Sequence, residues 1–155
     1  MEACVGTSGW YYSWNEGLSL DWYLEHSRLN AVELNASFYR FPFPNQVLSW
    51  ARKGKALRWS VKVHQSVTHR YRFSGGAFEV WERFRRLFAP LDPSIDFYLF
   101  QAPPGFRNTE RVLDFAAKAG LGDETRCDNA DVTPDERRFD AGMVSYLRMV
   151  TSLIE

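Results

Sequence analysis

Short apolar segments alternate along the chain with longer segments of helical periodicity, as far as about residue 122. Four short segments read as β-strands, because they are apolar or alternate between apolar and polar residues and end at turn-forming residues. They are Ala3–Thr7, Ala31–Asn35, Arg58–His64 and Asp96–Gln101. The segment after each strand carries apolar residues at helical spacing and predicts a helix. These helices are expected over Leu20–Leu29, from Pro44 or Asn45 to Gly54, over Phe78–Phe88, and from Asn108 or Thr109 to Gly120.

The strand–helix order repeats four times and predicts an α/β fold with parallel strands, since a helical crossover returns the chain to the same edge of the sheet. Each strand is polar on one face only. Trp59, Val61 and Val63 alternate with polar residues, and Glu33 and Asn35 lie on the opposite face of their strand from its apolar residues. A sheet covered by helices on both faces would need almost continuously apolar strands. A partial TIM-barrel-like fold, with polar side chains inside the barrel, is therefore expected.

The last part of the chain has a different character. Asp123–Asp140 is rich in Asp, Glu and Arg and shows no fifth strand, whereas the spacing from Met143 to Ile154 favours a carboxyl-terminal amphipathic helix. We expect a barrel domain over residues 1–122 and an atypical polar tail over residues 123–155. A complete barrel of eight units needs about 200–250 residues, so about four units suggest the amino-terminal half of a truncated barrel. Its open sheet edges would favour a homodimer or aggregation.

Composition and charge exclude several classes of protein. The 155 residues are 45% hydrophobic and 25% charged, as in soluble globular proteins. Nineteen basic and nineteen acidic residues cancel, so nucleic acid is not an expected partner, although the basic segments Arg70–Phe73 and Glu82–Arg86 keep it as an alternative. No apolar run suits a signal peptide or a membrane span. With two cysteines, Cys4 and Cys127, we predict a cytoplasmic protein without a disulfide framework and with Cys4 buried.

The candidate site follows from the barrel, because polar interior side chains gather at the carboxyl ends of parallel strands. Glu33 with Lys62 could be a general acid or base with a charged neighbour that tunes its pKa, or a structural ion pair inside the barrel. We take Glu33, Lys62 and His69 as the catalytic candidates. The residues expected to bind the substrate, a small molecule of unidentified chemistry, are Ser8, Trp10, Asn35, Tyr39, Arg40, His64 and Gln101.

Other groups of residues leave further alternatives open. His64 and His69 with Glu33 could hold a divalent metal, but a spacing of five is not a ligand signature, so neither a metal nor a cofactor is predicted. Aromatic loop residues could stack on a sugar ring or a base, or pack on one another and cap the barrel; they are Trp10, Tyr11, Tyr39 and Phe41. Three loop arginines could bind phosphate or carboxylate, or be solvated; they are Arg40, Arg70 and Arg72.

Four motifs occur in an order that resembles a known family. They are GTSGW at Gly6–Trp10, VELNASFYRFP at Val32–Pro42, WSVKV at Trp59–Val63 followed by Thr68-His69, and QAPPGF at Gln101–Phe106. Together they resemble the YecE-like family, a domain of unknown function with a TIM-barrel-like fold. The resemblance extends over residues 4–121. It implies that the site residues named above, except His64, are signature positions of the family, and it does not assign them roles.

Fold-level analogy favours a small-molecule enzyme of hydrolase or isomerase type, with its site at the carboxyl-terminal rim of the strands. The alternatives are a non-catalytic binding module, linked to nucleic acid, and an inactive truncated remnant.

Overall fold

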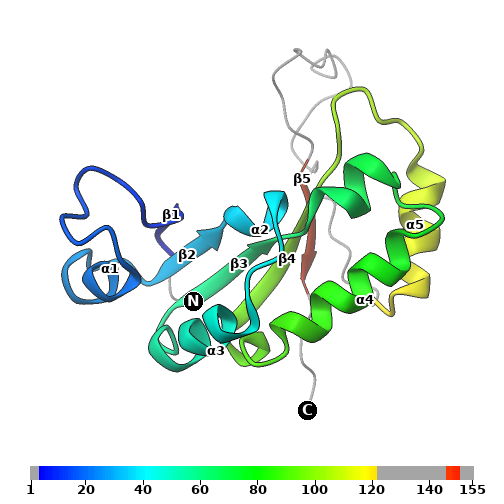
Figure 1. Cartoon of the computed structure of the whole chain (residues 1–155). Coiled ribbons are helices and arrows are strands. Elements are labelled where there is room, and N and C mark those ends of the chain that lie inside the picture. Colours follow the sequence, from blue (N-terminus) through cyan, green and yellow to red (C-terminus); the bar gives the residue numbers. More distant parts are fainter. Residues whose placement is uncertain (1–3, 122–145, 151–155) are drawn as a thin grey trace.

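The computed structural model describes residues 4–121 and the backbone of residues 146–150, and the rest of the chain lies outside the described residues. Four strands form a parallel sheet in the order of the sequence, as predicted. They are β1 (Gly6–Ser8), β2 (Ala31–Leu34), β3 (Arg58–Lys62) and β4 (Ile95–Gln101). Helices α1 (Leu20–His26), α3 (Pro44–Lys53), α4 (Ala77–Phe88) and α5 (Thr109–Lys118) follow them in turn (Figure 1).

Two of the helices begin with a side-chain cap. The Ser19 hydroxyl accepts a hydrogen bond from the backbone N–H of Trp22 and starts α1, and the Asn108 side chain accepts one from Arg111 and starts α5. Each cap satisfies a backbone donor that the first helical turn leaves free. None of the helices in the described ranges has the length and apolar character needed to cross a membrane.

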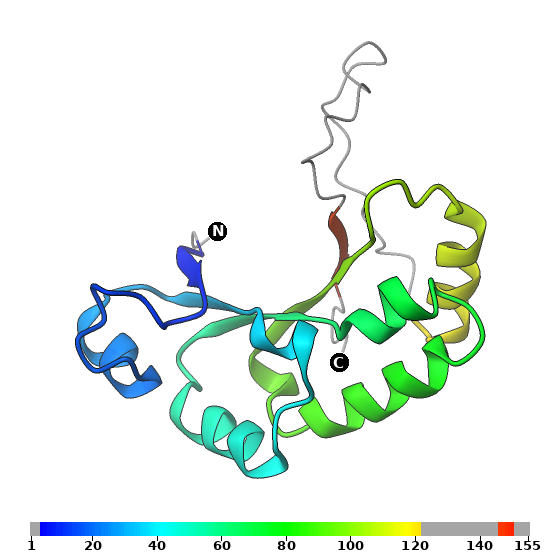
Figure 2. The same cartoon turned by 45° about the horizontal axis from the view of Figure 1, so that its top comes forward.

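Strand alternation sorts the side chains into two faces, as predicted. The outward side chains of β2 and β3 are buried beneath the helices: Val32, Leu34, Trp59 and Val61. On β4, Tyr98 and Phe100 pack against Trp81 of α4. Figure 2 shows the curved sheet with α1, α3 and α4 along one face. The opposite, concave face carries Glu33 beside Ser60 in the strand register.

Two short helical turns occupy segments that the sequence predicts as loops, and both lie at the carboxyl ends of the strands. Helix α2 (Ala36–Tyr39) directly follows β2, and a turn of π-helix, η1 (Ser66–Arg70), follows β3. The Ser37 hydroxyl hydrogen-bonds to the carbonyl oxygens of Leu34 at 2.8 Å and Lys62 at 2.6 Å. This side chain therefore fixes α2 on the ends of both strands. A 3₁₀ turn, η2 (Asp92–Ser94), precedes β4.

The structure corrects three sequence-based expectations. Tyr146–Val150 forms strand β5, which pairs antiparallel with β4, so the amphipathic helix expected there is wrong for these five residues. The other residues expected in that helix, Met143 and Ile154, lie outside the described residues. Cys4 precedes β1 and is exposed, whereas we expected a buried strand thiol. Helical spacing also predicts that Val47, Leu48 and Ala51 face inward from α3; Val47 is buried, but Leu48 is 57% exposed.

Candidate functional site

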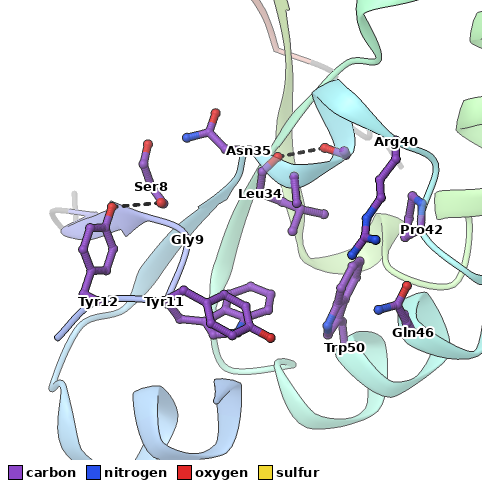
Figure 3. A pocket seen from close by; sticks show the side chains of 13 residues that line it. Ser8, Gly9, Tyr11, Tyr12, Leu34, Asn35, Arg40, Pro42, Gln46 and Trp50 are labelled. Atoms are coloured by element: carbon purple, nitrogen blue, oxygen red, sulfur yellow. Dashed lines mark hydrogen bonds between the residues drawn. The ribbon is translucent and has the colours of Figure 1, made fainter. Parts of the chain in front are cut away.

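A pocket of about 380 Å³ opens at the carboxyl ends of β1 and β2. Its walls come from the loop after β1, from α2, and from one side of α3 (Figure 3). The lining residues fall into an aromatic group (Trp10, Tyr11, Tyr12 and Trp50) and a polar group (Ser8, Asn35, Ser37, Arg40 and Gln46). Apolar walls with a few polar groups are typical of sites for small molecules.

The floor of the pocket is a cluster of tryptophans that continues into the core. Trp10 is buried and lies edge-on to Trp50, with ring centroids 5.9 Å apart, and edge-on to Trp59 at 6.1 Å. Gly9 has a φ of +90° and turns the chain at the end of β1, so that Trp10 can fold back over the sheet. Tyr11, in contrast, is 73% exposed and presents its ring to the pocket. The floor is therefore rigid, and the outer wall is accessible.

Ser8 joins this pocket to the catalytic candidate Glu33. Its hydroxyl donates a 2.8 Å hydrogen bond to Oε1 of Glu33, and Ser8 also lines the pocket. The two residues are neighbours in the β1–β2 register, which is why the contact forms. Tyr12 holds the same turn through a 2.9 Å hydrogen bond from its hydroxyl to the carbonyl of Ser8 (Figure 3). The Glu33 carboxylate is therefore bonded to a residue of the pocket wall, although Glu33 itself does not line the pocket.

Arg40 gives the pocket a positive charge. Its guanidinium lies on the same side of the pocket as Trp50 and Gln46, across from Tyr11 (Figure 3). Among the described residues, no Asp or Glu lines this pocket, and no carboxylate forms an ion pair with Arg40. An anionic group entering the pocket would therefore find an uncompensated cation.

Lys62 and His69 come together on a shared aromatic ring. Nζ of Lys62 lies 4.9 Å from the centroid of the Phe38 ring, and the imidazole of His69 meets the same ring edge-on at 5.1 Å. Burial, followed by the charges of Lys62 and Arg72, holds the pKa of His69 below its usual value, so the imidazole is neutral at pH 7. A neutral imidazole beside a cation can accept a proton.

Lys62 and Glu33 do not form the ion pair considered from the sequence. Within residues 4–121, the ion pairs are Lys53–Asp21 and Arg58–Asp96, while Glu33 bonds to Ser8 and Lys62 lies over Phe38. The two side chains lie on one face of the sheet but one step apart along it, because Glu33 is opposite Ser60 in the register. The Glu33 carboxylate is therefore paired with Ser8, and the Lys62 ammonium with the Phe38 ring.

His64 does not face the side of the sheet that strand alternation predicts for it. Strand β3 ends at Lys62, so the alternation no longer holds at His64. Its ring packs against Phe41 with centroids 4.9 Å apart, and Phe41 in turn packs against Phe84 of α4. Burial is the main cause that lowers the pKa of His64, and the nearby Arg83 adds to the effect. His64 therefore lies on the helix side of the sheet, outside the pocket lining, and its role in substrate binding stays a prediction.

The remaining candidates lie around the rim. Tyr39 is 70% exposed and stands edge-on to Phe38 at 5.1 Å, outside the pocket lining. Gln101 ends β4 on the concave face, and within the described part no hydrogen bond joins it to Glu33, Lys62 or His69. His64 and His69 face different sides, and in residues 4–121 no three His, Cys, Asp or Glu side chains gather as metal ligands.

Four of the aromatic and polar residues of the pocket were not proposed from the sequence: Tyr12, Ser37, Gln46 and Trp50. Gln46 and Trp50 lie one turn apart on α3, so they share a face of that helix. This spacing was visible in the sequence. Only the tertiary placement of α3 beside the loop after β1 shows that the shared face lines a pocket.

The fold and the site can now be compared with known proteins. The chain has no match among curated proteins. A solved structure of a DUF72 family protein from Enterococcus faecalis V583 is similar in fold, with a TM-score of 0.58 and 22% sequence identity. The similarity covers 73% of this chain and 44% of that chain, so the present chain spans less than half the length of this relative. A family model described as "Protein of unknown function DUF72" matches residues 4–127. Because this match covers more than half of the chain, the protein belongs to the DUF72 family, and the resemblance to YecE-like proteins carried by its four motifs is confirmed.

Proposed function

We propose that the protein is a small-molecule enzyme of hydrolase or isomerase type, whose site lies at the carboxyl-terminal rim of its parallel strands. One observation carries the proposal: the 380 Å³ pocket shares Ser8 with the Glu33 carboxylate. A ligand that contacts Ser8 would therefore be separated by one side chain from a carboxylate that can exchange protons. Hydrolases and isomerases commonly use such a group as a general acid or base.

The roles of the residues follow from their surroundings. The aromatic wall formed by Tyr11 and Trp50 suits a flat apolar face of a polar molecule, such as a sugar ring. Glu33 would act as the general acid or base, with Ser8 fixing its orientation through Oε1. His69 and Lys62 would take part from the neighbouring strand, as a neutral proton acceptor and a fixed positive charge.

A thermal-shift panel of polar metabolites, run on the intact chain, tests the binding part of the proposal. A ligand at a hundred times its Kd stabilises a protein by about 2.7 kcal/mol, which corresponds to a rise of several degrees in Tm. Tyr11→Ala should remove the shift, because Tyr11 lines the pocket and is too exposed to contribute much to folding. Leu48→Ala on the exposed side of α3 is the matched control and should retain the shift.

Turnover of a ligand found in this way tests the chemical part. Glu33→Gln keeps the size of the side chain and its hydrogen bond from Ser8, so it should bind the ligand but lower turnover by about two to four orders of magnitude. Unchanged turnover in this variant would remove Glu33 from the mechanism. Salt-sensitive retention on nucleic acid, with no stabilising small molecule, would favour a binding module and contradict the proposal.

A further inference from the structure

Three basic side chains surround the turn that follows β3: Lys62, His69 and Arg72. We infer that they form an oxyanion site, which takes a phosphate or carboxylate group. The inference rests on the proposed function in one respect, since the oxyanion would belong to the substrate. The site itself is argued from its own contacts.

Aromatic packing holds two of the three groups in place. The Phe38 ring of α2 lies below Nζ of Lys62 at 4.9 Å and meets the His69 ring at 5.1 Å. On its other side, His69 is fixed by a 2.8 Å contact between its Nδ1 and the hydroxyl of Thr68, which is fully buried. With Nδ1 engaged, Nε2 of His69 is the nitrogen available to a ligand.

The backbone brings the third group to the same place. Arg72 and Phe73 have φ values of 48° and 60°, and two successive residues with a Cβ rarely adopt this left-handed conformation. Phe73 is held there because its side chain is buried against Phe106 and Phe115. Arg72 is exposed next to it and close enough to His69 to lower the pKa of that imidazole. The strained turn therefore brings Arg72 near enough for its positive charge to act on the His69 imidazole.

The cluster has no acidic partner in the described part of the chain. Neither Lys62, His69 nor Arg72 forms an ion pair with a carboxylate there, and the neighbouring Glu33 accepts its hydrogen bond from Ser8. The groups that face His69 are the Lys62 ammonium of β3, the Arg72 guanidinium, the Thr68 hydroxyl and the Phe38 ring. Two cations and no anion around a neutral imidazole leave a favourable position for a negative charge.

Binding of an oxyanion has a direct consequence for protonation. Burial, Lys62 and Arg72 all lower the pKa of His69 in the free protein. An oxyanion between these groups would offset the two positive charges and favour the imidazolium, so binding would be accompanied by proton uptake at His69. His64 serves as an internal control, because the cation that lowers its pKa is Arg83 of α4, which does not belong to this cluster.

Histidine NMR titrations of the intact chain test the inference. Sulfate serves as the probe because its charge is constant from pH 4 to pH 8, and chloride at equal ionic strength controls for screening. Sulfate should raise the pKa of His69 by about half a unit or more and leave that of His64 unchanged. Methyl phosphate and acetate, used afterwards, distinguish phosphate from carboxylate as the preferred group.

Variants assign the effect to the cluster. Arg72→Gln and Lys62→Gln should each raise the pKa of His69 in chloride, because a repelling charge is lost, and should each reduce the response to sulfate at least threefold. Arg70→Gln is the matched control, since Arg70 lies over the Tyr71 ring and should leave both properties unchanged. Equal responses of His69 and His64 to sulfate would overturn the inference, as would loss of the response in Arg70→Gln. Neither result depends on Glu33 or on turnover, so this inference and the proposed function can fail separately.

Discussion

The contact between Gly54 and Trp59 beneath the pocket permits a quantitative test of the packing. A Cβ atom added at Gly54 would lie 2.6 Å from Cζ2 of Trp59 and 3.0 Å from the carbonyl oxygen of Trp50, whereas carbon atoms in contact prefer about 3.5–4.0 Å. Trp59 cannot move aside easily, since it is fully buried and its Nε1–H donates a 3.0 Å hydrogen bond to the Gly54 carbonyl.

The expected free energies follow from these contacts. Overpacking in Gly54→Ala should destabilise the protein by about 1–3 kcal/mol. The reduced conformational freedom of the unfolded chain offsets about 0.4–1 kcal/mol of this loss. The net loss then lies between about 0 and 2.6 kcal/mol, with a central value of about 1.3 kcal/mol. Trp59→Phe loses the indole hydrogen bond and part of the buried ring, at about 2 kcal/mol. Phenylalanine has no atom at the Cζ2 position, so the double variant should be about 1 kcal/mol more stable than the sum of the single effects predicts.

Urea unfolding followed by circular dichroism measures all four proteins without relying on tryptophan fluorescence. Two results would refute the reasoning: Gly54→Ala as stable as the wild type, or effects that add within about 0.3 kcal/mol. Trp59 also contacts Trp10 and Trp50 of the pocket floor. A confirmed coupling would therefore show that the pocket is built on a rigid core.

Three further predictions concern pH and a helix cap. Burial lowers the pKa values of His64 and His69, so the unfolded chain binds more protons than the folded protein in acid. The free energy of unfolding should therefore fall as the pH drops through about 6.5. The variant His64→Gln should lose less stability, and urea midpoints at pH 5 and pH 7 measure the difference. Burial, with a 2.6 Å hydrogen bond from its hydroxyl to Asp92, raises the pKa of Tyr98. The wild type should therefore lose stability above a pH of about 10, and Tyr98→Phe should not show this loss. At pH 7 the same variant should be less stable than the wild type by about 1 kcal/mol, because the hydrogen bond is lost. Ser19→Ala should destabilise by about 1 kcal/mol in thermal unfolding, and an unchanged Tm would contradict its role as a cap.

Strand alternation was a reliable guide as far as each strand extends. It predicted that Trp59 and Val61 face the helices and that Glu33 and Lys62 face the opposite side, because this property depends only on local backbone geometry. It failed at His64, two residues beyond the end of β3, where the chain already turns into η1. The end of a strand depends on its partners, which a single sequence does not reveal.

Tertiary placement accounts for the other differences. Trp50 becomes a pocket residue because α3 packs near the loop after β1, and an ion pair of 2.6 Å between Lys53 and Asp21 of α1 supports that arrangement. Strand β5 was not predicted because helical spacing and strand alternation are hard to distinguish in a segment of five residues. Its antiparallel pairing with β4 also joins residues more than forty positions apart in the sequence. Neither relation has a local signal.

Helix α2 links the pocket to the oxyanion site, and Asn35 before it offers the last test of their relation. Asn35 lines the pocket, whereas Phe38 within α2 supports Lys62 and His69. Oδ1 of Asn35 is buried without a hydrogen-bond partner in the described structure, and the side chain makes no cap to α2. A buried oxygen without a partner destabilises the fold, and we propose that a ligand in the pocket donates a hydrogen bond to it.

Asn35→Ala should therefore leave the free energy of unfolding within about 0.5 kcal/mol of the wild type, or raise it, because no native hydrogen bond is lost. The same change should weaken the binding of a ligand found in the thermal-shift panel by about two- to tenfold, since a net hydrogen bond contributes about 0.5–1.5 kcal/mol. Urea unfolding and isothermal titration calorimetry give the two quantities separately. A loss of stability above 1 kcal/mol with unchanged affinity would make Asn35 a structural residue and place the ligand elsewhere on the rim.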